Sequence, residues 1–368
     1  MRFDPETVMR PVLLAALACL AAAPAFGQGQ VNVYNWSDYI DENKLKEFAR
    51  TSGLKVNYTT YDSNEILDAK LRTGKSGYDL VVPTASPFFV RQLAAGLFRP
   101  LDRSKLANYR HLDPEVMAAL AKLDPANAHG VPWMWGTTGI GYNVEAIRKR
   151  MPDAPLDSLR MVFDPAVVAK FRDCGVMMLD SATDVLPAAL RYLGLDPDSK
   201  KPDELKRAAD VIGAVRPFVR KFHSSEYINA LAGGNICLAF GFSGDIFQAR
   251  DRGEKAKDKQ TIAYAIPKEG ALMWIDVATI PKDAPNPDAA HRFLDFMLDP
   301  AVAAASSALT GYANANRAAT ALLDKEISGN PLIYPPAEVR ARFYSITPGT
   351  AEQIRERTRL WTTAKTGR

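Results

Sequence analysis

The chain reads Val-Asn-Val-Tyr at residues 31–34, Leu-Lys-Val-Asn-Tyr at 54–58 and Asp-Leu-Val-Val-Pro at 79–83. The first segment alternates and is rich in β-forming residues, and the third is an apolar run typical of a buried parallel strand. Two stretches with helical spacing, 45–53 and 63–74, lie between these segments. Because strand and helix alternate, we predict a doubly wound α/β lobe with right-handed crossovers.

The two intervening helices have apolar faces and end signals. Leu45, Phe48 and Ala49 share one face of the first helix, which Gly53 ends. The second helix follows Ser63 and ends at Gly74, and we expect three side chains of this helix to point inward: Ile66, Leu67 and Leu71.

The rest of the chain predicts a second α/β region. Residues 135–143 read Trp-Gly-Thr-Thr-Gly-Ile-Gly-Tyr-Asn, which fits a β-type crossover between two lobes. A helix is expected at 204–215, a strand at 236–240, and a further helix with Asn286 as its N-cap and Pro287 in its first turn. We therefore predict an α/β fold of two doubly wound lobes with a hinge and a central cleft at the strand ends. Lobe one is expected at 30–137 plus about 278–325, and lobe two at 138–277 plus about 326–368.

Composition and the N-terminus indicate an exported globular protein. Of 368 residues, 47% are hydrophobic and 24% are charged, and the net charge of +4 is too small to suggest a nucleic-acid binder. An apolar run at 12–23 is followed by Ala25-Phe26-Gly27, so residues 1–27 are predicted to be a signal peptide. That run is too short to span a membrane, and the mature protein is expected to be soluble outside the cytoplasm.

Cysteine usage agrees with an oxidising compartment. Removal of the signal would also remove Cys19 and leave Cys174 and Cys237. An even pair in such a compartment favours one disulfide, with two buried free thiols as the alternative.

Acids and aromatic residues recur together at the ends of the expected strands and, near Met273, on an expected strand itself. The segments are Trp36-Ser37-Asp38-Tyr39, Phe242-Ser243-Gly244-Asp245, Trp274-Ile275-Asp276 and a loop around Tyr312. In any one loop the acid could be a helix cap and the ring could belong to the core. As a set, they fit an alkyl diammonium ion, because carboxylates would hold its ends and aromatic faces would cover its methylenes and attract its charge.

Other chemistries find less support in the sequence. An anion-binding site would need Arg or a glycine-rich helix start at these loops, and neither occurs there. The four histidines are scattered without zinc-ligand spacing, and Ser243 lacks a Gly-x-Ser-x-Gly context. Asp38, Asp245 and Asp276 could pair as acid and base in an exported hydrolase, which remains an alternative. We predict no enzyme activity, no cofactor and no metal.

At the same loops the sequence resembles the periplasmic putrescine-binding proteins of bacterial polyamine ABC importers, and less closely their spermidine-binding relatives. The resemblance covers essentially the whole mature chain. Its motifs are Tyr-Asn-Trp-Ser-Asp-Tyr-Ile at 34–40, Tyr-Asp-Ser-Asn-Glu at 61–65, Asp-Leu-Val-Val-Pro at 79–83, Thr-Thr-Gly-Ile-Gly-Tyr-Asn at 137–143, His-Ser-Ser at 223–225, Tyr-Ile-Asn at 227–229, Tyr-Ala-Ile-Pro-Lys-Glu-Gly-Ala at 264–271, Tyr-Ala-Asn-Ala-Asn at 312–316 and Tyr-Pro-Pro at 334–336.

The resemblance implies which residues contact the ligand and in which compartment the protein acts. It implies that Trp36, Ser37 and Asp38 contact one end of the ligand and that Asp245 and Asp276 neutralise ammonium groups. It also implies a disulfide, a periplasmic monomer and a partner permease in the inner membrane. The remaining residues that it places around the ligand are Tyr39, Thr84, Asp184, Ser224 or Ser225, Phe242, Trp274 and Tyr312.

Three positions depart from the putrescine-binding pattern. Phe242 stands where a Trp is common, Trp274 stands where the nearest relatives have Phe, and Asp184 is one methylene shorter than the usual Glu. A Trp at the position of Trp274 is also seen in the spermidine-binding relatives, so the resemblance favours putrescine only slightly over spermidine and leaves agmatine and cadaverine open. A binding protein of the same fold for another cationic solute and a sensor that presents the same ligand to a membrane partner are further alternatives.

Overall fold

A computed structural model describes residues 29–367 of the chain. The predicted signal peptide at 1–27 lies outside this range. The strands are β1 (Gln30–Trp36), β2 (Lys55–Tyr61), β3 (Leu80–Val81), β4 (Gly130–Asn143), β5 (Val176–Met178), β6 (Lys221–Phe222), β7 (Leu238–Phe242), β8 (Ile262–Ala265), β9 (Met273–Thr279) and β10 (Ala313–Asn314).

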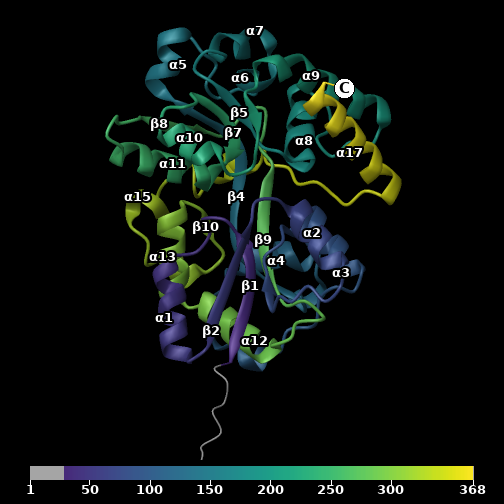
Figure 1. Ribbon diagram of the computed structural model, residues 1–368, viewed down its shortest axis with the longest axis vertical. Coiled ribbons are helices and arrows are strands. Elements are labelled where there is room, and N and C mark those ends of the chain that lie inside the picture. Colours follow the sequence, from purple (N-terminus) through teal and green to yellow (C-terminus); the bar gives the residue numbers. More distant parts are fainter. Residues whose placement is uncertain (1–28, 368) are drawn as a thin grey trace, which may run out of the picture.

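Helices surround these strands (Figure 1). They are α1 (Glu42–Ser52), α2 (Asn64–Arg72), α3 (Val90–Ala94), α4 (Pro114–Ala121), α5 (Val144–Arg150), α6 (Arg160–Phe163), α7 (Pro165–Val168), α8 (Ala182–Tyr192), α9 (Pro202–Val215), α10 (Tyr227–Ala232), α11 (Ser243–Lys255), α12 (Pro287–Met297), α13 (Pro300–Thr310), α14 (Arg317–Thr320), α15 (Lys325–Ser328), α16 (Ala337–Arg340) and α17 (Ala351–Thr366).

Two lobes share one sheet with the strand order β2-β1-β3-β9-β4-β7-β5-β6. The first lobe is built on the parallel strands β1, β2 and β3, and the second lobe on the parallel strands β5, β6 and β7. The long strand β4 pairs antiparallel with β9 along one half and with β7 and β8 along the other. Strand β4 therefore runs from one lobe into the other, as Figure 1 shows, and the glycine-rich crossover predicted at 135–143 lies within it.

The first lobe begins with the predicted strand–helix alternation, and its local signals act as expected with one exception. Asp41 caps α1 by accepting the Asn43 N–H at 2.9 Å, and Gly53 ends that helix in a left-handed conformation with φ of 69°. The prediction that Ile66 points inward is wrong, because the residue is 48% exposed. Leu67 and Leu71, one turn apart, are the residues of α2 that share the buried face.

Asn286 behaves differently from the expected N-cap of α12. Its side chain makes no capping hydrogen bond. Its backbone N–H and its amide Nδ2 instead donate to the fully buried Asp79, which also accepts the backbone N–H of Asn32 at 2.7 Å. Asp79 thereby ties β1 to the start of α12.

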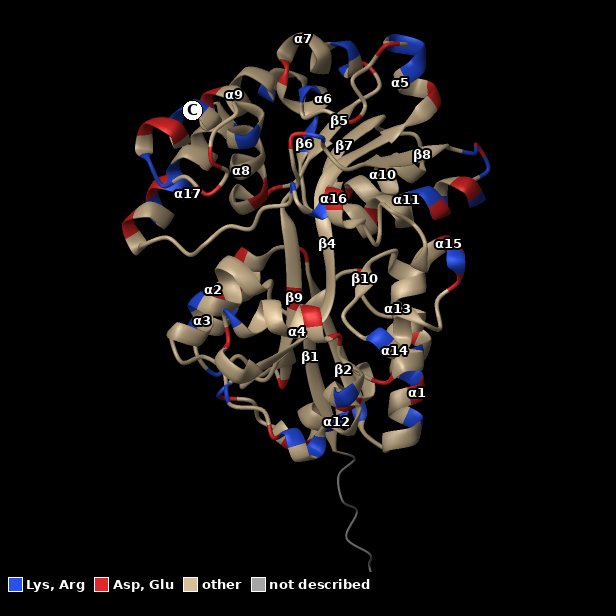
Figure 2. Ribbon diagram, turned by 180° about the vertical axis from the view of Figure 1, so that it is seen from behind, with Lys and Arg blue, Asp and Glu red and all other residues tan. Residues whose placement is uncertain are grey.

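Each lobe has its own hydrophobic core. Val33, Leu80 and Phe293 belong to a core of the first lobe, and Phe163 and Phe240 to the core of the second. Lys, Arg, Asp and Glu are interspersed on the outer helices of both lobes (Figure 2). Within residues 29–367, no helix is both long and apolar enough to cross a membrane.

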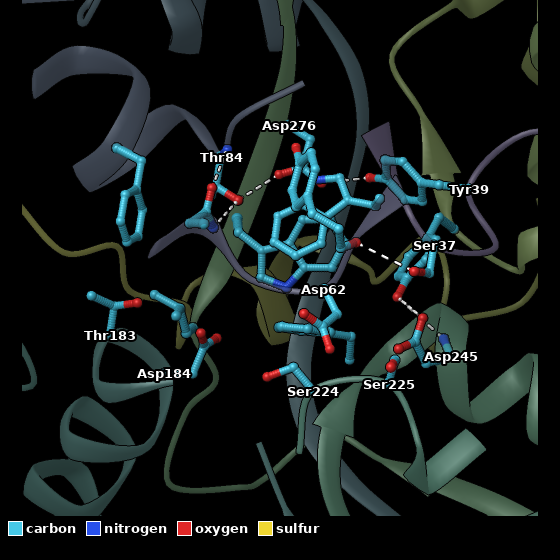
Figure 3. A pocket seen from close by; sticks show the side chains of 18 of the residues that line it. Ser37, Tyr39, Asp62, Thr84, Thr183, Asp184, Ser224, Ser225, Asp245 and Asp276 are labelled. Carbon is cyan, nitrogen blue, oxygen red and sulfur yellow. Dashed lines mark hydrogen bonds between the residues drawn. The ribbon is translucent and has the colours of Figure 1, made fainter. Parts of the chain in front are cut away.

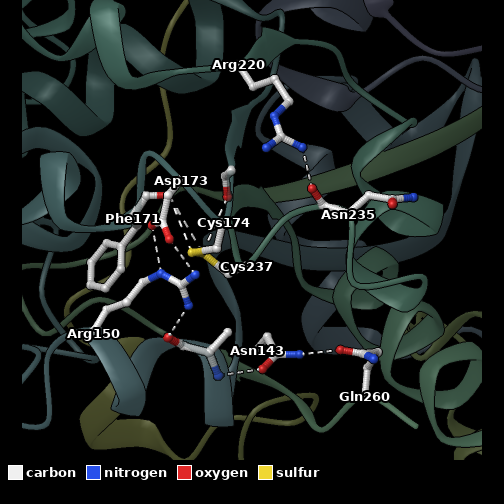
Figure 4. The surroundings of a disulfide bond; sticks show 11 residues. Asn143, Arg150, Phe171, Asp173, Cys174, Arg220, Asn235, Cys237 and Gln260 are labelled. Atoms are coloured by element: carbon white, nitrogen blue, oxygen red, sulfur yellow. Dashed lines mark hydrogen bonds and ion pairs between the residues drawn. A yellow bond between two sulfur atoms is a disulfide. The ribbon is translucent and has the colours of Figure 1, made fainter. Parts of the chain in front are cut away.

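The predicted disulfide is present in the second lobe (Figure 4). Cys174 precedes β5 and Cys237 precedes β7, and their Cα atoms lie 5.5 Å apart across a sequence separation of 63 residues. The bridge therefore joins the starts of two adjacent parallel strands. A closed loop of this length restricts the unfolded chain strongly.

We expect replacement of both cysteines by serine to lower the free energy of unfolding by about 2–4 kcal/mol, because the unfolded chain regains its freedom. Urea denaturation of the two proteins under non-reducing conditions measures the difference. Coincident unfolding curves for the variant and its parent would contradict a stabilising role for this bridge.

Candidate functional site

A cavity lies between the two lobes, with about 660 Å³ of space not filled by atoms, part of which opens to solvent. Carboxylates, hydroxyls and aromatic rings from both lobes face this space (Figure 3). The lining residues are Trp36, Ser37, Tyr39, Tyr61, Asp62, Asn64, Thr84, Ser86, Pro87, Phe88, Thr183, Asp184, Ser224, Ser225, Ile228, Phe242, Asp245, Leu272, Trp274, Asp276, Tyr312 and Ile346.

Asp276 projects from the middle of β9 and is 3% exposed. Tyr39 donates its hydroxyl hydrogen to Oδ2 at 2.7 Å, and Thr84 donates to Oδ1 at 2.6 Å. Burial raises the pKa of Asp276 to about 7, although the two hydroxyl groups lower it in part. The carboxylate is thus held in place by hydroxyls from the loops after β1 and β3.

Asp245 lies in the first turn of α11 and is also held by two hydroxyls. Tyr227 donates to Oδ2 at 2.6 Å, and Tyr312 donates to Oδ1 at 2.5 Å. The two phenols come from different lobes, since Tyr227 packs in the core of the second and Tyr312 in that of the first. Burial raises the pKa of Asp245 to about 6, and the tyrosine hydrogen bonds limit that rise.

Asp184 is the third buried carboxylate, in the first turn of α8. It accepts the hydroxyl hydrogens of Ser181 at 2.7 Å and Thr138 at 2.8 Å. Burial raises its pKa as well, against the effect of these two hydroxyls. All three carboxylates therefore follow one design, in which neutral donors bind both oxygens.

Aromatic rings line the space between these acids. The ring of Phe242 meets the ring of Trp36 edge to face at 6.4 Å and that of Trp274 at 5.7 Å. Trp274 in turn meets Tyr312 at 5.2 Å between ring centres. Such rings cover methylene groups and present negative faces to a cation.

The charge of the lining residues has one sign. Among residues 29–367, the lining includes four aspartates and no lysine or arginine. Removing carboxylates from water without a cationic partner is unfavourable, and the raised pKa values of Asp245 and Asp276 reflect that cost. The arrangement is complementary to a small ligand with at least two positive charges and an apolar body.

The structure brings the predicted site residues together around the cavity, with the exception of Asp38. Trp36 and Ser37 line the cavity at the end of β1, where the Trp36 indole N–H donates to the Val82 carbonyl at 2.9 Å. The other predicted residues that line it are Tyr39, Thr84, Asp184, Ser224, Phe242, Asp245, Trp274, Asp276 and Tyr312.

Asp38 lies outside the lining, on the rim. Its side chain is 45% exposed and pairs with Arg252 of the second lobe at 2.9 Å, and its backbone has a left-handed φ of 53°. Its neighbours Ser37 and Tyr39 line the cavity, whereas Asp38 does not. Asp38 thus bridges the two lobes at the rim instead of joining Asp245 and Asp276.

Sequence reasoning missed two kinds of residue. Asp62 and Ile346 line the cavity but were not among the predicted contacts, although Asp62 follows Tyr61 at the end of β2 and stands in one of the matched motifs. Tyr227 stands in a matched motif, but it is fully buried and reaches the site only through Asp245, so its role depends on how α10 packs against α11.

Comparisons with known proteins agree with this geometry. Residues 44–335 match the model of the bacterial extracellular solute-binding protein family. The chain is 46% identical to the putrescine-binding periplasmic protein SpuD of Pseudomonas aeruginosa, over 99% of this chain and 98% of SpuD. It is 45% identical to the putrescine-binding periplasmic protein PotF of Escherichia coli, over 96% of each chain.

Solved structures show the same architecture. The spermidine/putrescine ABC transporter substrate-binding protein PotD of Streptococcus pneumoniae superposes with a TM-score of 0.72 at 28% identity, covering 92% of this chain and 98% of that one. The fold and the cleft define a two-lobed solute-binding protein. The chain belongs to the bacterial extracellular solute-binding protein family.

Replacing Tyr227 with Phe should raise the pKa of Asp245 above its value of about 6, because the carboxylate loses one of its two hydroxyl donors. Carbon-13 NMR titration of the aspartate carboxyl groups measures this shift. Tyr264→Phe is the matched control, since Tyr264 is equally buried but bonds to Thr137. An unchanged Asp245 titration in the Tyr227 variant would contradict the assigned hydrogen bond.

Proposed function

We propose that this protein is the periplasmic polyamine-binding component of an ABC importer, with putrescine slightly favoured over spermidine. One observation carries the proposal: buried carboxylates from both sides of the cleft face a ring-lined cavity into which the described part of the chain places no cationic side chain. A linear diamine supplies two ammonium groups for the acids and methylenes for the rings. The names of SpuD and PotF support the same ligand.

In this proposal Asp245 and Asp276 receive the two ammonium groups, and Trp36, Phe242 and Trp274 enclose the chain between them. Several hydroxyl donors already orient the carboxylates, so ligand binding orders few protein groups. Micromolar capture corresponds to about −8 kcal/mol, which two charge-assisted contacts and stacked rings can supply.

The proposed cycle needs binding and release but no covalent step. The lobes, 30–137 with 278–325 and 138–277 with 326–368, close on the ligand because only the closed state supplies contacts from both sides. The permease then recognises the closed form and accepts the ligand. We propose that the protein acts as a monomer without catalytic turnover.

Isothermal titration with putrescine tests the proposal through two variants. Asp276→Asn should weaken binding about ten-fold or more, because a buried charge partner is lost. Asp38→Asn should weaken it by at most about five-fold, since Asp38 belongs to a half-exposed ion pair at the rim. Equal losses for both variants would show that Asp38 contacts the ligand directly.

Affinity for putrescine should fall by roughly ten-fold or more between pH 8 and pH 5.5. Asp276 and Asp245, with pKa values of about 7 and 6, take up protons in this range, while the alkylammonium groups stay charged. Titration calorimetry at a series of pH values measures the trend.

The free energy of unfolding of the unliganded protein should show the opposite pH dependence and rise as pH falls. For these two groups the folded pKa exceeds the unfolded one, so their ionisation penalises the folded state above pH 7 and the penalty disappears as pH falls toward 4. In the double variant Asp245→Asn with Asp276→Asn, the pH dependence of putrescine affinity and that of the free energy of unfolding should both disappear. A pH-independent affinity in the parent protein would contradict the assignment of these acids.

A further inference from the structure

Two of the matched motifs meet across the mouth of the cleft. One follows β2 and contains Asp62, and the other lies between β6 and α10 and contains His223 and Ser224. His223 Nε2 lies 3.7 Å from Asp62 Oδ2. Asp62, Ser224 and Ser225 line the cavity, and Figure 3 shows the Asp62 carboxylate on the side that faces the two serines.

Asp62 differs from the three carboxylates described above. Within residues 29–367, no hydrogen-bond donor reaches either of its carboxylate oxygens, and 31% of its side chain is exposed. The separation of 3.7 Å from His223 exceeds that of a normal N–H···O hydrogen bond. Both oxygens of Asp62 are therefore open to an N–H donor that enters the mouth.

His223 can lose its contact with Asp62 at little cost. Its Nδ1 accepts the backbone N–H groups of Ser225 and Glu226, each at 3.2 Å, so the ring proton resides on Nε2. That N–H also faces Glu226 Oε1 at 3.2 Å. When Asp62 turns to a ligand, Glu226 still satisfies the imidazole.

Ser224, from the second lobe, adds a hydroxyl oxygen to the lining on the side that the Asp62 carboxylate faces (Figure 3). Its Oγ accepts the backbone N–H of Asp180 at 3.2 Å and keeps a second lone pair. An ammonium group between Asp62 and Ser224 would thus find a carboxylate from the first lobe and a hydroxyl from the second.

We propose that Asp62, with Ser224, forms a third ammonium subsite at the mouth of the cleft, so that the pocket accepts a triamine such as spermidine. The inference rests on the proposed polyamine binding. A diamine is satisfied deeper in the cleft by Asp245 and Asp276, whereas a triamine extends a further charged group toward the mouth. Asp62 therefore determines affinity for the third charge and contributes little to diamine binding.

Calorimetry of Asp62→Asn with putrescine and with spermidine tests this subsite. Spermidine affinity should fall at least about five-fold, while putrescine affinity stays within about two-fold of the parent, because only the triamine places a charge there. Since Asp62 accepts no hydrogen bond from any described residue, the variant should melt within about 2 °C of its parent.

His223→Asn is the matched control. The Asn Oδ1 can replace Nδ1 as the acceptor for Ser225 and Glu226, while the contact from Nε2 to Asp62 is removed. We expect this variant to bind both amines within about two-fold of the parent, because the subsite depends on Asp62 and not on the ion pair.

Three results would overturn the subsite. Asp62→Asn and His223→Asn could weaken the binding of both amines equally, which would mean that the ion pair stabilises the closed arrangement of the lobes. Asp62→Asn could leave spermidine binding unchanged, or the parent could bind putrescine and no triamine. In all three cases the proposed function would stand, whereas a parent that binds neither amine would refute that function and the subsite together.

Discussion

Three carboxylates lie buried in the cleft, and each is held by two hydroxyl groups where a cationic side chain would be the usual partner. This arrangement keeps the acids oriented but leaves their charge uncompensated, as the raised pKa of Asp276 shows. A polycationic ligand supplies the missing positive charge. Hydrogen bonds from hydroxyl groups therefore orient the carboxylates without placing a cationic side chain where the ligand would bind.

The fold provides the space that these hydroxyls need. A Cβ atom on Gly241 would lie 2.6 Å from the Tyr227 ring, and one on Gly244 would lie 2.5 Å from the Tyr312 ring. Both glycines stand next to Phe242 or Asp245, at the end of β7 and the start of α11. The two phenols can therefore pack directly on the backbone that carries Asp245, and they reach both of its oxygens.

Much of this could be predicted from the sequence, and particular residues show where prediction stopped. Period-two and apolar segments identified the α/β class, and strand ends identified Trp36 and Asp245, because parallel strands end at a common edge. Asp276 was identified by its neighbour Trp274, although it lies inside the antiparallel strand β9 and not at a strand end. The prediction for Ile66 was wrong because an apolar residue next to the buried face of Leu67 and Leu71 also fits helical spacing. Long-range hydroxyl partners such as Tyr227 leave no local signature, since their role depends on the packing of distant elements.

Asp38 and Asp62 illustrate the limit most clearly, because each follows a strand of the first lobe within two residues. Asp38 has a left-handed backbone and pairs with Arg252 at the rim, whereas Asp62 lies in the lining with its oxygens open. Each of the two acids follows an aromatic residue at a strand end, so residue type alone does not separate them. Composition near a strand end can locate a binding edge, but the long-range partner of each side chain, such as Arg252 for Asp38, is needed to say which carboxylate lines the cavity.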